Sequence, residues 1–181
     1  MIRESHPLQQ LFIELIGRHY AEEIGIRDPQ IVNYVAHLMA EFCEVEQLFK
    51  IRNGADKPLT DVGEMLIESN PVYGPAPSFD RERQVRKHIG DYTLFFTGMF
   101  PESINHFRLR RDRTENFVDW IKAGKESYYI VSSLSISSTR RWRRYSPVCR
   151  VISSSAFTGL TKSRTICRRC NTRLCVARMK F

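Results

Sequence analysis

Two pairs of side chains combine an imidazole with a carboxylate at helical spacing. His37 and Glu41 are four residues apart in one apolar-periodic segment, and His88 and Asp91 are three residues apart in another. Carboxylates and imidazoles on facing helices are the ligands with which helical bundles build metal sites. In both pairs, however, the histidine precedes the acid, which reverses the usual Glu-x-x-His order. Two interpretations stay open: a metal-binding or small-ligand enzyme site inside a bundle, or a solvated face on the first segment and a buried hydrogen-bonded pair on the second.

Asp91 stands out because it lies inside an apolar run. A buried charge without a partner is costly, so we expect a nearby cation or a tyrosine hydroxyl to bind it. The nearest candidates along the chain are Arg86, Lys87 and His88. A structural role for Asp91 is therefore favoured over a catalytic one.

The sequence contains no glycine-rich phosphate loop, nucleophile elbow or zinc-protease helix. Catalytic residues therefore stay unassigned, and no cofactor is expected.

The charge of the chain divides into two unlike parts. The net charge is +8, but residues 1–126 hold 16 Lys and Arg against 20 Asp and Glu, a balance of −4. The remaining residues hold 12 Lys and Arg and no acid, a balance of +12. A basic stretch of this kind with interspersed aromatic residues can bind nucleic acid through phosphate contacts and stacking. The candidates for phosphate contacts are Arg140, Arg141, Arg143 and Arg144.

Four of the five cysteines lie in the same C-terminal part. Cys149, Cys167, Cys170 and Cys175 could supply four thiolates to zinc. One Cys-x-x-Cys pair is present, but the second pair that zinc ribbons and fingers require is missing. The spacing therefore gives little support to a zinc site.

Residues 132–181 show neither helical nor alternating periodicity, and they are rich in Ser, Arg and Cys. One interpretation is a basic, disordered interaction tail, because such a segment lacks the apolar surface that offsets chain entropy. The other is translation out of frame. Back-translating the tail with GC-rich codons and reading two bases later, from Leu134 onward, can give FEHLLDEAVAAVLARLSGHFEFCVHGL, which has the pattern of an amphipathic helix.

Helical periodicity organises residues 1–131. It predicts helices over residues 7–25, 29–51 and 78–100, the last capped by Ser78. It also predicts a short helix capped by Thr60, with Val62, Leu66 and Ile67 facing inward, a short helix over residues 101–109, and a helix from Thr114 that includes Phe117 and Ile121. The fold class is therefore all-α: a compact, bundle-like domain of about five to six helices over residues 1–131. An irregular tail over residues 132–181 follows it.

Five segments of the body, HPLQQLF, GIRDP, VGEMLIES, RKHIGDYTLFFTGMFPE and GKESYY, carry a family resemblance. Through them, residues 6–131 resemble a group of uncharacterised bacterial helical proteins. The resemblance implies an all-helical fold in which the chain continues as helix after the paired tyrosines. No activity is established for that group of proteins, so the resemblance assigns no functional residue to this chain.

The favoured function is that of a cytoplasmic interaction or scaffold module. No apolar run reaches the roughly 18 to 20 residues that cross a bilayer, and the polar N-terminus does not have the pattern of a signal peptide. Exposed apolar helix faces would bind a protein partner or a second copy of the chain. The alternatives are the helical enzyme that uses His37, Glu41, His88 and Asp91, and nucleic-acid binding if the basic tail is genuine.

Overall fold

The computed structural model of the chain describes residues 7–72, 78–100, 117–134 and 146–153. In these ranges the regular elements are helices, and the only β contact is an isolated bridge between Arg52 and Pro58. The expected all-α fold is confirmed. None of the described helices has the length and apolar character to span a membrane.

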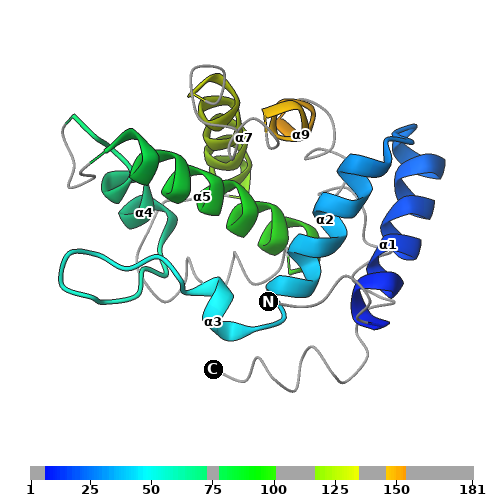
Figure 1. Cartoon of the computed structure of the whole chain (residues 1–181), viewed down its shortest axis with the longest axis horizontal. Helices are drawn as coiled ribbons and strands as arrows, with labels where there is room; N and C mark the ends of the chain where they lie inside the picture. The colour runs from blue at the N-terminus through cyan, green and yellow to red at the C-terminus, as the bar shows by residue number, and fades with distance from the viewer. Residues whose placement is uncertain (1–6, 73–77, 101–116, 135–145, 154–181) are drawn as a thin grey trace.

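The first two helices form a hairpin beside the centre of the fold (Figure 1). α1 (Pro7–His19) continues into a short π-helix, η1 (Tyr20–Ile24), and Gly25 ends it with a left-handed backbone at φ 77°. α2 (Pro29–Glu41) begins as the sequence predicts, with the Asp28 carboxylate accepting a 2.8 Å hydrogen bond from the Gln30 amide. Proline in the first turn fits because that position has no intrahelical amide bond to lose.

The second helix is shorter than expected. Instead of running to about residue 51, α2 ends at Glu41, and a turn leads into α3 (Val45–Leu48). A continuous helix would direct Val45 inward, whereas the turn leaves Val45 exposed and buries Leu48 completely. The break therefore exchanges one buried apolar side chain for another, and it brings the Leu48 carbonyl toward the central helix.

α4 (Val62–Glu68) also differs from expectation in its cap and in its buried face. Asp61 rather than Thr60 caps it, because the Asp61 carboxylate accepts from the Glu64 amide at 3.0 Å. The Thr60 carbonyl instead accepts a 3.2 Å hydrogen bond from the Tyr92 hydroxyl. Val62 is buried, but Ile67 is exposed. The inward orientation expected for Ile67 is therefore wrong.

α5 (Phe79–Met99) is the central helix, as the sequence predicts. The Ser78 hydroxyl caps it by accepting from the Arg81 amide at 3.2 Å. From Val85 to Met99 nearly every side chain is buried, because α2, α4 and α7 cover different parts of the helix (Figure 1). Aromatic contacts fill the C-terminal half, among them Phe42 with Phe95 at 5.4 Å and Tyr92 with Trp120 at 5.8 Å between ring centroids.

The last two described helices extend past the predicted domain boundary at residue 131. α7 (Phe117–Leu134) packs along α5 and buries Ser132. α9 (Ser146–Val151) lies against α7 and α2, with Val148, Cys149 and Ile152 buried. For residues 132–134 and 146–153 the structure is therefore helical or packed where the sequence suggested an irregular tail. Thr114, residues 101–109 and the rest of the tail lie outside the described residues.

Candidate functional site

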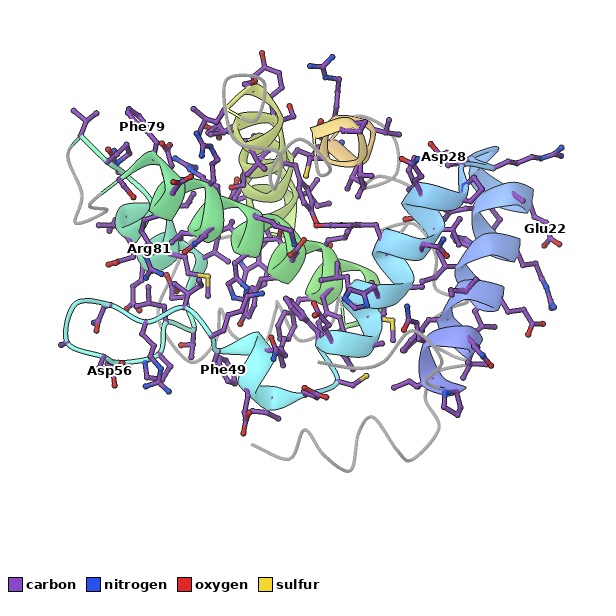
Figure 2. All side chains as sticks on the ribbon, in the orientation of Figure 1. Glu22, Asp28, Phe49, Asp56, Phe79 and Arg81 are labelled. Atoms are coloured by element: carbon purple, nitrogen blue, oxygen red, sulfur yellow. The ribbon has the colours of Figure 1, made fainter. Side chains whose placement is uncertain are left out.

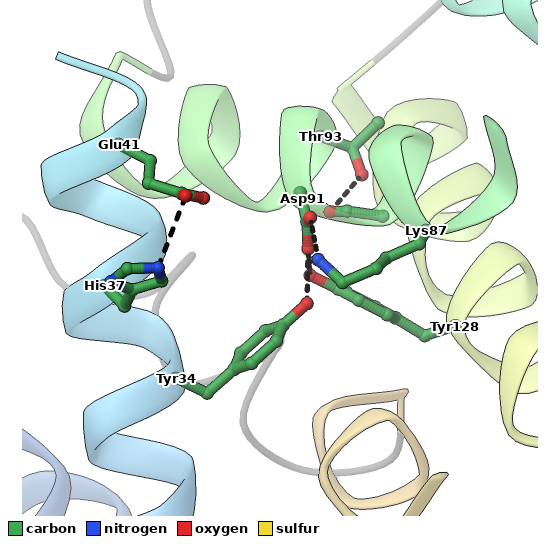
Figure 3. A network of polar contacts seen from close by, with 8 residues as sticks. Tyr34, His37, Glu41, Lys87, Asp91, Thr93 and Tyr128 are labelled. Atoms are coloured by element: carbon green, nitrogen blue, oxygen red, sulfur yellow. Dashed lines mark hydrogen bonds and ion pairs between the residues drawn. The ribbon is translucent and has the colours of Figure 1, made fainter. Parts of the chain in front are cut away.

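The carboxylate of Asp91 is the centre of a buried polar network, shown in Figure 3. Its Oδ1 atom accepts hydrogen bonds from the hydroxyls of Tyr34, at 2.6 Å, and Tyr128, at 2.7 Å. Its Oδ2 atom pairs with the Lys87 ammonium at 2.6 Å. We call Tyr34, Lys87, Asp91 and Tyr128 the Asp91 cluster. The expected partners of Asp91 are thus confirmed as one cation and two tyrosine hydroxyls.

Three helices position the cluster. α5 supplies Lys87 and Asp91 one turn apart, α2 supplies Tyr34, and α7 supplies Tyr128 (Figure 3). The Lys87 ammonium also lies 5.1 Å from the centroid of the Tyr34 ring, a favourable cation–π distance. The network therefore joins helices that are far apart in sequence through one carboxylate.

Gly90 makes the approach of α7 possible. A Cβ atom at this position would lie 2.9 Å from the Tyr128 ring, closer than packed side chains approach. The absence of a side chain lets the ring lie directly on α5, with its hydroxyl at Asp91.

Electrostatics keep Asp91 ionised and both tyrosines neutral. Burial alone would raise the pKa of Asp91, but the charges of Lys87 and Lys50 and the hydrogen bonds that it accepts outweigh this effect and lower the pKa. Burial, reinforced by the charge of Asp91, raises the pKa of Tyr34 and Tyr128 well above the ordinary value. The tyrosine hydroxyls therefore act as permanent donors to a permanent anion.

Cys149 approaches the cluster from α9. Its thiol is fully buried, and burial followed by the charge of Asp91 raises its pKa to about 12. A thiol with this pKa is protonated at neutral pH, so it is a poor nucleophile in this position. Cys149 therefore acts as an apolar cover of the Asp91 cluster. Cys167, Cys170 and Cys175 lie outside the described residues.

His88 is buried apart from the Asp91 carboxylate. Its Nε2 atom lies 3.2 Å from the Leu48 carbonyl, and its ring contacts Phe42 and Tyr92. Burial first, and then the charge of Lys50, lower the pKa of His88 to about 3. The imidazole is therefore neutral at physiological pH, with Nε2 donating to the carbonyl.

His37 and Glu41 form a separate pair on α2, with 3.3 Å between His37 Nε2 and a Glu41 carboxylate oxygen. The hydrogen bond from His37 lowers the pKa of Glu41 against the opposing effect of partial burial. Both side chains are partly exposed, as expected for a solvated helix face.

The structure does not bring the four sequence candidates together as ligands. His37 pairs with Glu41, His88 with a backbone carbonyl, and Asp91 with the other members of its cluster. In the described ranges, no group of three or more His, Cys, Asp or Glu side chains is placed to hold a metal ion. Donors already bind both oxygens of Asp91, so the arrangement stabilises a buried anion and holds helices together.

A second feature is a set of three exposed apolar side chains near the junction of α4 and α5, which sequence reasoning missed. Ile67, Val72 and Phe79 are 68%, 72% and 60% exposed. They lie close along the chain to an ion pair of 3.7 Å between Glu68 and Arg81, which joins the two helices. We call Ile67, Val72 and Phe79 the α4–α5 corner. Figure 2 shows Phe79 at the outer, N-terminal end of α5.

The only sequence signal for this corner was the number of apolar residues in α4. Val62, Leu66 and Ile67 cannot all face inward on two turns of helix, because Ile67 is five residues from Val62, and five residues correspond to about 500° of rotation. Phe79 precedes the apolar stripe of α5 and occupies its first helical position.

Comparisons of the chain with protein-family models, with curated proteins and with solved structures found no match. The function is therefore inferred from the geometry of the residues themselves. Arg140, Arg141, Arg143 and Arg144, the candidates for nucleic-acid contacts, lie outside the described residues.

Proposed function

We propose that this protein is a helical interaction module that binds a protein partner through the α4–α5 corner. The observation that carries the proposal is the grouping of three large apolar side chains, each more than half exposed, at one junction of two helices. Several large apolar side chains exposed near one junction are typical of protein-binding sites, whereas single exposed apolar residues are ordinary.

The rigidity of the corner supports this role. The Arg81 guanidinium pairs with Glu68 and also donates a 2.8 Å hydrogen bond to the Arg52 carbonyl. The caps at Asp61 and Ser78 define the starts of α4 and α5. A surface whose supporting elements are held in this way loses little conformational entropy when a partner binds.

Catalysis has less support than binding. Asp91 and Tyr128 are buried, both tyrosines of the cluster are held neutral, and the Asp91 carboxylate is already bonded by three donors. A general base needs a lone pair directed at a substrate proton, and a nucleophile needs a lowered pKa. The enzyme alternative therefore stays a prediction without a supporting geometry, and nucleic-acid binding stays a prediction about the tail.

We place the proposed module in the bacterial cytoplasm. The resemblance of residues 6–131 to bacterial helical proteins supports the bacterial origin. Cys149 is a free thiol, as is usual in a reducing compartment. The out-of-frame origin of the tail is likewise a proposal, and resequencing the coding DNA across residues 126–181 tests it.

Photocrosslinking in cells tests the interaction surface. A photoreactive phenylalanine analogue at position 79 should yield a discrete adduct, and Ile67→Asp in the same chain should abolish that adduct. Tyr129 on α7, which is 63% exposed, provides the control: Tyr129→Asp should leave the adduct intact. An adduct that persists in Ile67→Asp, or the absence of any adduct at position 79, would contradict the proposal.

A further inference from the structure

The size of the α4–α5 corner limits what it can bind. Three partly exposed side chains offer on the order of a few hundred Å² of apolar surface. A standard interface between two folded proteins buries about 800 Å² on each partner. The corner is therefore too small to hold a stable second copy of the chain by itself, and its size suits a short segment with a few anchoring side chains.

The charge around the corner favours one sign of partner. Residues 61–83 contain five acids and two arginines, a balance of −3. Both arginines are engaged internally: Arg81 with Glu68, and Arg83, which is buried, with Asp80. Three of the five acids, Asp61, Glu68 and Glu82, are buried, so the exposed carboxylates are those of Glu64 and Asp80. Glu64 is exposed one turn before Ile67, and the Asp80 side chain, next to Phe79, is 67% exposed.

Each of the two helices carries one exposed apolar residue close along the chain to one exposed carboxylate. Glu64 and Ile67 are three residues apart on α4 and so share a face, while Phe79 and Asp80 are consecutive at the start of α5. A ligand that contacts Ile67 or Phe79 is therefore close to a carboxylate. Opposite charges at the rim of an apolar contact select partners and speed their association.

We propose that the α4–α5 corner binds a short basic and apolar segment of a partner protein. Leu-like or aromatic side chains of this segment contact Ile67, Val72 and Phe79, and its Lys or Arg residues lie beside Glu64 and Asp80. This inference rests on the proposed function and adds the chemical class of the partner to it.

The test measures binding of defined peptides to the full chain by fluorescence anisotropy at physiological salt. The first probe is a labelled amphipathic peptide of about 14 Leu and Lys residues, and the second replaces every Lys with Glu. We expect the Leu/Lys peptide to bind. Phe79→Asp and Ile67→Asp should each weaken its binding at least about ten-fold, and Glu64→Lys should weaken it about three-fold or more.

Tyr129→Asp is the matched control, because it adds the same charge at another exposed aromatic residue. It should leave the affinity for the Leu/Lys peptide unchanged. Circular dichroism and thermal unfolding of each variant identify any loss of folding. Two independent aspartate variants keep the test valid if one of them fails to fold.

The outcomes separate the inference from the proposed function. If Phe79→Asp weakens the binding of both peptides equally and Glu64→Lys weakens the binding of neither, the corner is a binding surface. The inference that its partner segment is basic is then overturned. If neither aspartate variant weakens the binding of the Leu/Lys peptide, both the inference and the proposed function are overturned. Self-association of the full chain that Phe79→Asp abolishes would assign the corner to a second copy and would also overturn the inference.

Discussion

At the scale of single residues, Asp91 links more of the fold than any other polar side chain in the Asp91 cluster. One carboxylate oxygen accepts hydrogen bonds from Tyr34 on α2 and Tyr128 on α7. The other oxygen pairs with Lys87 on the same helix as Asp91. A buried charge bonded in this way contributes little net stability compared with apolar packing, but removing one partner is costly because it leaves the other uncompensated.

Asp91→Asn should destabilise the fold by about 2 to 3 kcal/mol, as measured by urea unfolding. The amide oxygen can still accept from the tyrosines, but the amide nitrogen faces the Lys87 ammonium, so two donors meet. Partial exposure of Lys87 limits the cost, since its ammonium can move toward water.

Glu14→Gln provides a control for Asp91→Asn. It makes the same carboxylate-to-amide change in the exposed Glu14–Arg18 pair and should alter the free energy of unfolding by less than about 0.5 kcal/mol. Equal effects of the two substitutions would contradict a structural role for the Asp91 cluster.

His88 should make stability fall as the solution becomes acidic. The unfolded state takes up a proton near the ordinary pKa of 6.5, whereas the folded state does so only near 3. The contribution is therefore fully present above pH 6.5 and is lost progressively as pH falls toward 3. Between pH 7 and pH 5 this linkage amounts to about 2 kcal/mol.

Urea unfolding at a series of pH values checks the His88 prediction. His88→Gln keeps a donor for the Leu48 carbonyl and should remove about 2 kcal/mol of the change between pH 7 and pH 5. His37→Gln, on the exposed face of α2, should keep the part of the change that His88 causes. If the free energy of unfolding of His88→Gln depends on pH as fully as that of the wild type, the assignment of a neutral, buried imidazole to His88 is wrong.

At the scale of elements, local signals placed most helix starts, and long-range packing decided the differences. The caps at Asp28 and Ser78 and the long apolar run of α5 were predictable, because each depends on neighbouring residues. The end of α2 was not predictable, because it depends on the burial of Leu48 against residues far along the chain. Helix geometry shows that Val62, Leu66 and Ile67 cannot all face inward, but which of them is exposed depends on how α4 packs against α5.

Gly90→Ala should destabilise the fold even though alanine favours helix. The new Cβ would lie 2.9 Å from a Tyr128 ring that packing and the hydrogen bond to Asp91 hold in place. Overpacking of this kind costs about 1 to 3 kcal/mol, against a gain of about 1 kcal/mol in helix propensity.

Gly17→Ala on α1 is the control for Gly90→Ala. Its Cβ would meet Val32 at an ordinary 3.6 Å, so thermal unfolding should show unchanged or increased stability. A stabilising Gly90→Ala would contradict the close approach of α7 to α5.

The packing of α9 predicts a slow thiol reaction. Cys149 is fully buried and its pKa is raised to about 12, so iodoacetamide should modify it only as fast as the fold opens. Peptide mapping by mass spectrometry measures the rate for each cysteine separately. If Cys149 is modified as rapidly in the native chain as in urea, α9 does not cover the Asp91 cluster.

At the scale of the whole molecule, the buried polar cluster and the exposed apolar corner have different roles. The Asp91 cluster joins α2, α5 and α7 near the middle of α5, whereas the α4–α5 corner lies at the N-terminal end of α5 and is exposed. Figure 1 shows α4 beside that end of α5 and α7 farther along it. The sequence identified Asp91 and its need for a partner, but it could not select Tyr34 and Tyr128 among seven tyrosines. That choice depends on how three helices assemble.

The most direct test of this division is the affinity of Asp91→Asn for the Leu/Lys peptide, measured where the variant is fully folded. We predict the wild-type affinity together with a reduced free energy of unfolding, because the corner does not contact Asp91. A folded Asp91→Asn variant that loses peptide binding would contradict the account, and it would place the binding site at the Asp91 cluster.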